Sequence, residues 1–181
     1  MKPRPMEPII RHCFEQDLQN VQFIYAHHVL HGTGTFETAA PSLDEMRQRW
    51  AKVVERGWPF LVATADNDLT RVVGFAYAGQ FRDRAAYART FETSLYVAPS
   101  MSRRGIGYAL LMSLLSELQD IGARQVLAVI GDSDNAASIA VHGKAGFKKA
   151  GILYGVGEKF GRPLDVVLMQ RPLAEQESGV G

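Results

Sequence analysis

The stretch 94–111, SLYVAPSMSRRGIGYALL, runs from an apolar strand-like segment through a short turn into a leucine-rich helix. Gly105 and Gly107 remove the side chains that would keep a ligand away from the turn's backbone. The start of a helix leaves several amide N–H groups without intrahelical partners, and the helix dipole is positive there. Arg103 and Arg104 add two cations. The turn is therefore predicted to bind an anion.

Two well-known phosphate loops do not fit this turn. A P-loop requires Lys and Ser or Thr after its last glycine, whereas Gly107 is followed by Tyr108 and Ala109. A dinucleotide fingerprint requires a third glycine where Leu110 stands. Glycine also occurs in strand-to-helix turns for purely structural reasons, so a turn that binds no ligand stays open as an alternative.

Hydrophobic spacing around this stretch predicts a mixed α/β chain. Helices are predicted over 17–32, 42–57, 107–122 and 135–145, and strands over 9–13, 60–65, 72–79, 91–99, 126–130, 147–154 and 165–170. Ser42 and Glu45 form a capping-box pair at the start of the second helix. The wholly apolar run 126–130 indicates a strand covered on both faces.

The composition is that of one globular domain. The chain has 181 residues, 46% hydrophobic and 22% charged. Its formal net charge of +1 argues against nucleic acid as a partner. Its single cysteine, Cys13, excludes an internal disulfide, and no apolar run reaches the length of a signal peptide or a membrane span. We expect a cytoplasmic protein with no membrane partner, a leader over 1–8, a domain over 9–173 and a flexible tail over 174–181.

Two motifs together resemble the GNAT superfamily of acyl-CoA-dependent N-acyltransferases. The turn 102–107, SRRGIG, is similar to that family's Gln/Arg-x-x-Gly-x-Gly/Ala motif, although Ser102 stands where Gln or Arg is usual. The segment 134–147, DNAASIAVHGKAGF, is similar to its second motif.

Four longer segments resemble one branch of that superfamily, the phosphinothricin and methionine sulfone/sulfoximine acetyltransferases. They are HGTGTFET (31–38), AYAGQFRDRAAYARTFETSLYVAPSMSRRGIG (76–107), AVIGDSDNAAS (128–138) and VGEKFGRPLD (156–165). The resemblance covers roughly 7–173. It implies an α/β GNAT fold, with a mixed central sheet splayed in the middle and helices on both faces.

The implied activity is transfer of an acetyl group from acetyl-CoA to the α-amino group of a small amino acid. Phosphinothricin, methionine sulfone and methionine sulfoximine are the acceptors that the resemblance suggests. It also implies a homodimer and a reaction without a metal.

The resemblance assigns the acetyl-CoA site to two groups of residues. Backbone groups of Leu95, Tyr96 and Val97 are expected to pair with the pantetheine arm. The other expected cofactor residues are Arg103, Arg104, Gly105, Ile106, Gly107 and Tyr108 for the pyrophosphate, Asn135 for the pantetheine arm and Lys144 for the adenosine phosphate. Asn135 fits equally a helix N-cap.

Glu92 is the implied general base. An amine acceptor is mostly protonated at neutral pH and must lose a proton before it attacks a thioester. His142 stands where many GNAT enzymes carry a tyrosine that protonates the departing thiolate, and histidine is able to do either proton transfer. Surface exposure for Glu92 and a buried structural role for His142 are the alternatives.

Arg82 and Arg84 are expected to clamp the acidic head of the acceptor, since the guanidinium fork suits carboxylate, phosphinate or sulfone oxygens. A solvated charged loop is the alternative. Phe36 is expected to form a wall of the acceptor pocket.

Other functions stay open. A metal site is one alternative, because three histidines lie close together in the sequence at His27, His28 and His31. The sequence shows neither the His-Glu-x-x-His order nor a third ligand, so we expect no metal. Cys13 has no activating partner in the sequence, which argues against a nucleophile. A peptide N-terminus, an aminoglycoside or a polyamine is an alternative acceptor, and a non-catalytic acyl-CoA-binding module is an alternative of another class.

Overall fold

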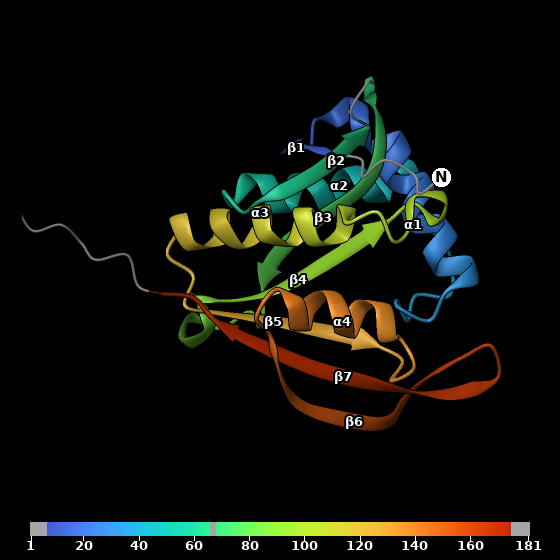
Figure 1. Cartoon of the computed structure of the whole chain (residues 1–181), viewed down its shortest axis with the longest axis vertical. Helices are drawn as coiled ribbons and strands as arrows, with labels where there is room; N and C mark the ends of the chain where they lie inside the picture. The colour runs from blue at the N-terminus through green and yellow to red at the C-terminus, as the bar shows by residue number, and fades with distance from the viewer. Residues whose placement is uncertain (1–6, 66–67, 175–181) are drawn as a thin grey trace, which may run out of the picture.

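The computed structural model describes residues 7–65 and 68–174, which form a mixed seven-stranded sheet with helices packed on it (Figure 1). In chain order the elements are β1 (Ile9–His12), α1 (Leu18–His31), α2 (Leu43–Glu55), β2 (Phe60–Ala65), β3 (Asp68–Gln80), β4 (Thr90–Val97), α3 (Ile106–Asp120), β5 (Gln125–Gly131), α4 (Ala136–Lys144), β6 (Lys148–Lys159) and β7 (Arg162–Pro172). Short 3-10 helices lie at Glu15–Asp17, Ala85–Tyr87 and Pro99–Met101. Within the described ranges, no helix has the length and apolarity needed to cross a bilayer.

The sheet is splayed between β4 and β5. The strand order is β1-β2-β3-β4-β5-β7-β6, and β4 and β5 run parallel. Their pairing covers Thr90–Thr93 against Gln125–Ala128, after which β4 continues to Val97 and β5 to Gly131. Figure 1 shows the two strands diverging toward their carboxyl ends. The predicted mixed and splayed sheet is confirmed.

Two hydrophobic clusters fix which helices cover which face. Helix α3 buries Leu110, Leu111, Leu114 and Leu118 completely, together with side chains of β2 to β5. Helices α1 and α2 pack on the opposite face, where Phe60, Val62 and Phe75 belong to the second cluster. Burying each such side chain contributes about 1.5–3 kcal/mol, so the leucine stripe holds α3 firmly on the sheet.

The capping-box prediction for α2 is confirmed. The backbone N–H of Glu45 donates to Ser42 Oγ at 3.2 Å, and the Ser42 N–H donates to Glu45 Oε2 at 2.6 Å. These bonds satisfy amide groups that the first turn of a helix leaves unpaired.

Three sequence predictions are wrong in part. Strands β6 and β7 extend to Lys159 and Arg162 where a loop over 155–164 was expected. Gly155 lies in a bulge between Leu153 and Gly157, after which Gly157 pairs with Leu164 and Glu158 pairs with Pro163. Strand β3 begins at Asp68, four residues before the predicted start at 72, and residues 66 and 67 lie outside the described residues.

Strand β5 is not covered on both faces. Val126, Ala128 and Ile130 are buried in the cluster that contains the leucines of α3, but Leu127 and Val129 on the other face are half-buried. Helices α1 and α2 belong to the cluster over β2 and β3, so this side of β5 is left accessible. Of the predicted leader and tail, residues 1–6 and 175–181 lie outside the described residues.

Candidate active site

The end of β4 offers backbone groups to a ligand. The N–H of Ala98 donates to the Val73 carbonyl at 2.9 Å, and Val97 lies opposite Gly74. In an antiparallel ladder the direction of the backbone groups alternates, so those of Leu95 and Val97 face away from β3. Because β5 has separated from β4 at this point, these groups are placed to pair with the amides of an extended ligand.

The side chain of His28 contacts one of these backbone groups, the carbonyl of Val97. Its Nε2 lies 2.8 Å from the carbonyl oxygen of Val97, and its ring packs 5.4 Å from that of Tyr96. Burial lowers the pKa of His28. The sequence pattern raised this histidine only as a metal ligand, because nothing local shows that α1 passes over the end of β4.

The glycine turn has the geometry of an anion site. Helix α3 starts at Ile106, and its N-cap, Gly105, has a left-handed φ of 82°. The first intrahelical bond runs from the Ala109 N–H to the Gly105 carbonyl, so three N–H groups precede it at the helix start. Arg103 and Arg104 are exposed beside them, and Arg103 also has a positive φ, of 62°.

Helix α4 brings further predicted cofactor residues to α3. Lys144 Nζ lies 4.2 Å from the ring centroid of Tyr108 in the first turn of α3. Asn135 caps α4 by accepting a hydrogen bond from the Ser138 N–H at 3.2 Å, and its Nδ2 lies 3.5 Å from the Gly131 carbonyl. The cap role of Asn135 is therefore observed directly.

His142 lies inside the fold. Its side chain is buried, with Nδ1 2.8 Å from the Ser138 carbonyl and the ring edge-on to Phe147. Since a carbonyl only accepts, Nδ1 carries the proton and Nε2 of the neutral ring has none to donate. Burial lowers the pKa of His142, which favours the neutral ring. This geometry favours the structural role over the acid role.

Glu92 lies on the opposite face of the sheet from α3. Side chains alternate along a strand, and Phe91 packs in the α3 cluster, so Glu92 and Ser94 point to the α1 and α2 side. Leu127, half-buried, is the β5 neighbour of Glu92. Burial raises the pKa of Glu92, and the positive charge of Arg82 opposes that rise.

Arg82 and Arg84 lie in an exposed loop between β3 and β4. The side chain of Gln80 shapes this loop by donating to the carbonyls of Arg82 and Arg84 at 2.7 and 2.9 Å. The Arg82 guanidinium stacks 4.5 Å from the ring centroid of Phe81. The structure thus brings Arg82 within electrostatic reach of Glu92.

The segment 32–38, here called the acceptor loop, joins α1 to α2. Tyr25 OH donates to Glu37 Oε1 at 2.8 Å and lies 3.0 Å from Thr35 Oγ1. Arg49 donates to both carboxylate oxygens of Glu37, at 2.7 and 3.1 Å. Lys159 is buried and donates to the Thr35 carbonyl at 2.9 Å. Phe36 is half-buried beside Gly131 at the end of β5.

Sequence reasoning missed Tyr25, Glu37, Arg49 and Lys159. Each has an ordinary local explanation, as a core aromatic or a surface charge. Only contacts between segments far apart in the chain bring them together at the loop.

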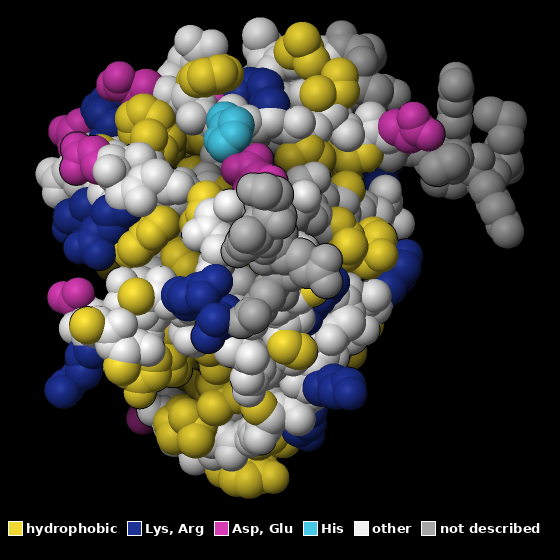
Figure 2. Space-filling view, turned by 90° about the vertical axis from the view of Figure 1, so that its left-hand side faces the viewer, with side chains coloured by type: hydrophobic (Ala, Val, Ile, Leu, Met, Phe, Trp, Pro, Cys, Tyr) yellow, Lys and Arg dark blue, Asp and Glu magenta, His cyan; other side chains and the backbone are white. Residues whose placement is uncertain are grey.

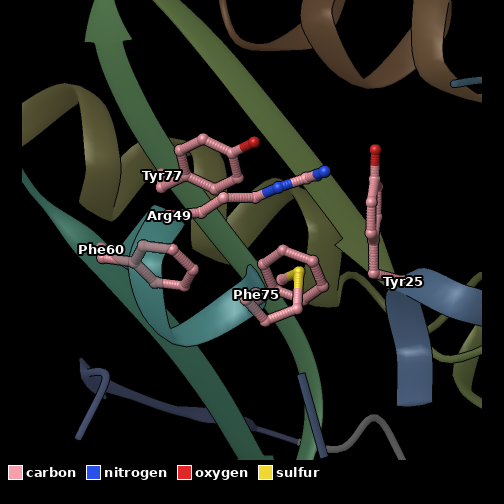
Figure 3. A pocket seen from close by; sticks show the side chains of 6 residues that line it. Tyr25, Arg49, Phe60, Phe75 and Tyr77 are labelled. Atoms are coloured by element: carbon pink, nitrogen blue, oxygen red, sulfur yellow. The ribbon is translucent and has the colours of Figure 1, made fainter. Parts of the chain in front are cut away.

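A small aromatic pocket supports this loop from α2. Figure 3 shows Arg49 extending past Tyr77 and Phe75 toward Tyr25. The pocket encloses about 10 Å³, which is about the space of one water molecule. The side chains that line it therefore pack closely against one another.

The remaining candidates lie away from these features. Cys13 is buried, which raises the pKa of its thiol to about 12 and keeps it protonated. The rings of His27 and His31 lie 4.8 Å apart. No group of three or more His, Cys, Asp or Glu side chains suited to a metal occurs in the described part of the chain.

Comparisons with known proteins agree with this geometry. The family model for the acetyltransferase (GNAT) domain matches residues 10–168. The chain belongs to the GNAT acetyltransferase family. As a member it is an acetyl-CoA-dependent N-acetyltransferase, and its splayed sheet is that of the GNAT fold.

Individual relatives show which GNAT enzymes this chain is similar to. The chain is 46% identical to a phosphinothricin N-acetyltransferase of Alcaligenes faecalis, over 91% of this chain and 82% of that protein. It is 34% identical to an L-methionine sulfoximine/L-methionine sulfone acetyltransferase of Pseudomonas aeruginosa, over 91% and 94%. It superposes with a TM-score of 0.88 on a phosphinothricin acetyltransferase of Sinorhizobium meliloti in complex with acetyl-CoA, at 37% identity and 94% coverage of both chains.

Proposed function

We propose that this enzyme acetylates the α-amino group of a small amino acid of the phosphinothricin, methionine sulfone or methionine sulfoximine type, with Glu92 as the general base. The observation that carries the proposal is the position of Glu92. It lies beside the opening between β4 and β5, on the face opposite α3, and is the one candidate base whose pKa burial raises. The names of the relatives support the acceptor class.

The two substrates reach the opening from different directions. The glycine turn of α3 and the backbone of Leu95 and Val97 would hold the pyrophosphate and the pantetheine arm of acetyl-CoA. The acceptor would lie over Glu92 and Leu127, with its acidic head at Arg82 and Arg84 and Phe36 as a wall. The thioester carbonyl then meets the amine in the gap between the strands, where positioning supplies much of the rate.

The reaction balances with groups that are present. Glu92 takes a proton from the ammonium, directly or through water, and the amine nitrogen attacks the thioester carbonyl. The nitrogen loses its second proton to solvent as the C–S bond breaks, and the thiolate of CoA takes up a proton from solvent. Glu92 then releases the proton that it accepted, so that one proton is set free in each turnover. His142 keeps α4 packed against Phe147 and takes no part in these steps.

A panel of acceptors tests the substrate class. CoA-thiol release is measured with acetyl-CoA and phosphinothricin, methionine sulfone, methionine sulfoximine, spermidine or a short peptide, and mass spectrometry locates the acetyl group. We expect release with the first three only, with the acetyl group on the α-nitrogen. Release with spermidine or the peptide alone would refute the acceptor class and leave the GNAT assignment intact.

We also propose a homodimer in the cytoplasm. Strand β6 lies at the edge of the sheet and exposes Tyr154 and Val156, and Phe160 is exposed in the turn that follows it. Figure 2 shows hydrophobic side chains gathered at the lower end of the molecule, where Figure 1 places β6. Light scattering on the purified protein is expected to give twice the chain mass of 20.0 kDa, and a mass of one chain would refute the dimer.

A further inference from the structure

The acceptor loop bridges the two halves of the splayed sheet. On the side of β1 to β4, Thr35 and Glu37 are held by Tyr25 and Arg49. On the side of β5 to β7, Thr33 Oγ1 donates to Asp132 Oδ2 at 2.7 Å. The loop therefore touches both halves where β4 and β5 no longer pair with each other.

Strand β6 turns two residues toward this loop. After the bulge between Leu153 and Gly157, the side-chain positions of Gly157 and Lys159 share one face of the strand. Lys159 Nζ donates to the Thr35 carbonyl at 2.9 Å. The position between them, Glu158, is exposed.

Two glycines form a slot for the ring of Phe36. A methyl group at Gly157 would overlap Cε2 and Cδ2 of the ring and lie 3.0 Å from Cζ. A methyl group at Gly131 would lie 2.9 Å from Cε1 and 2.6 Å from the Thr33 carbonyl. Neither glycine has a positive φ, so the ring of Phe36, and not the backbone conformation, demands glycine at position 157.

We propose that Gly157 is a positioning residue for acceptor recognition, because its missing side chain lets Phe36 dock and fixes the acceptor loop at the end of β5. The proposal rests on the proposed function, in which Phe36 forms a wall of the acceptor site. Gly157 itself contacts no substrate and acts through Phe36. A shift of this loop misplaces the acceptor and leaves the acetyl-CoA turn on α3 in place.

A double-mutant cycle tests this role. Gly157→Ala is expected to raise the KM for phosphinothricin by about tenfold or more, while the KM for acetyl-CoA changes less than about twofold. In a Phe36→Ala background the same change is expected to have little further effect, because the ring that it would displace is gone. Gly151→Ala on the same strand is the matched control, since no atom lies within 4 Å of its added methyl group.

Equal rises in the two KM values, no rise at all, or the same rise in the Phe36→Ala background would overturn the proposal. If Gly157→Ala does not fold, the double variant Gly157→Ala, Phe36→Ala carries the test. It lacks the ring that the added methyl group would meet, so it is expected to fold with the KM values of Phe36→Ala, and failure of the double variant to fold would overturn the proposal.

Hydrogen exchange of residues 33–37 gives a second readout that does not depend on the acceptor. We expect faster amide exchange in Gly157→Ala than in the wild-type protein and in Gly151→Ala. If the wild-type enzyme acetylates none of the acidic amino acids, the proposed function fails, and this exchange measurement still decides whether Gly157 fixes the loop. Unchanged exchange would refute that role.

Discussion

The imidazole Nε2 of His28 lies 2.8 Å from the carbonyl oxygen of Val97, at the end of the strand that should hold the pantetheine arm. A ring N–H is the only donor that His28 can offer to this carbonyl. The contact joins α1, which supports the acceptor loop, to the backbone that faces the splayed gap.

His28→Ala is therefore expected to weaken acetyl-CoA binding, because the end of β4 loses the bond that orients Val97. We expect a rise of about three- to tenfold in the KM for acetyl-CoA, which corresponds to the net value of one hydrogen bond. His28→Gln, which retains a donor, is expected to recover most of the loss, and His27→Ala at the neighbouring exposed position serves as control. An unchanged KM in His28→Ala would contradict this role.

Arg82 is expected to set the acid limit of activity. Burial raises the pKa of Glu92, and the charge of Arg82 lowers it, so removing the charge raises this pKa further. Only the deprotonated carboxylate accepts a proton. The acid limb of kcat/KM should therefore move to higher pH in Arg82→Ala, and a limb that stays in place or moves to lower pH would exclude the coupling.

Glu92 is also expected to cost stability at neutral pH. Burial makes the pKa of the Glu92 carboxyl higher in the folded protein than in the unfolded chain. The contribution of this carboxyl to folding stability is therefore fully present below the pKa of the unfolded state. It is lost as the pH rises through the pKa of the folded state, because the ionised carboxylate is then buried. Glu92→Gln should therefore raise the Tm at pH 7, with a smaller gain near pH 4. Glu55→Gln, at an exposed position of α2, is the control. A lower Tm for Glu92→Gln at pH 7 would argue against the burial effect.

Lys159 is expected to hold the acceptor loop from β6. Lys159→Met keeps the bulk of the side chain but leaves the Thr35 carbonyl without its donor, which costs about 1–3 kcal/mol when the group is buried. Urea unfolding should show this loss, and Lys148→Met, at an exposed position of the same strand, should not. Equal stabilities of the two variants would refute the role of Lys159.

Local sequence signals predicted the elements that local chemistry determines. The capping box at Ser42 and Glu45 and the leucine stripe of α3 lie in short segments, and both elements form as expected. The ends of β6 and β7 were missed because Gly155 and Pro163 resemble chain breakers until pairing across the hairpin is known.

The acceptor site is the part that sequence could least predict. Glu92 and Arg82 were proposed through resemblance, and the electrostatic effect of Arg82 on Glu92 appears only in the folded structure. Lys159 reads as a solvated cation in GEKFGR, and Gly157 reads as a flexible position. Their roles depend on a loop more than 100 residues away in the chain.

The most direct test of the account compares wild-type enzyme and Glu92→Gln with phosphinothricin at pH 7, under saturating acetyl-CoA. Calorimetry first establishes that both proteins bind acetyl-CoA with the same Kd. We predict that the wild-type enzyme releases CoA thiol and forms the N-acetyl product, and that Glu92→Gln lowers kcat by about 10²-fold. Equal kcat values for the two proteins would contradict the assignment of Glu92 as the base.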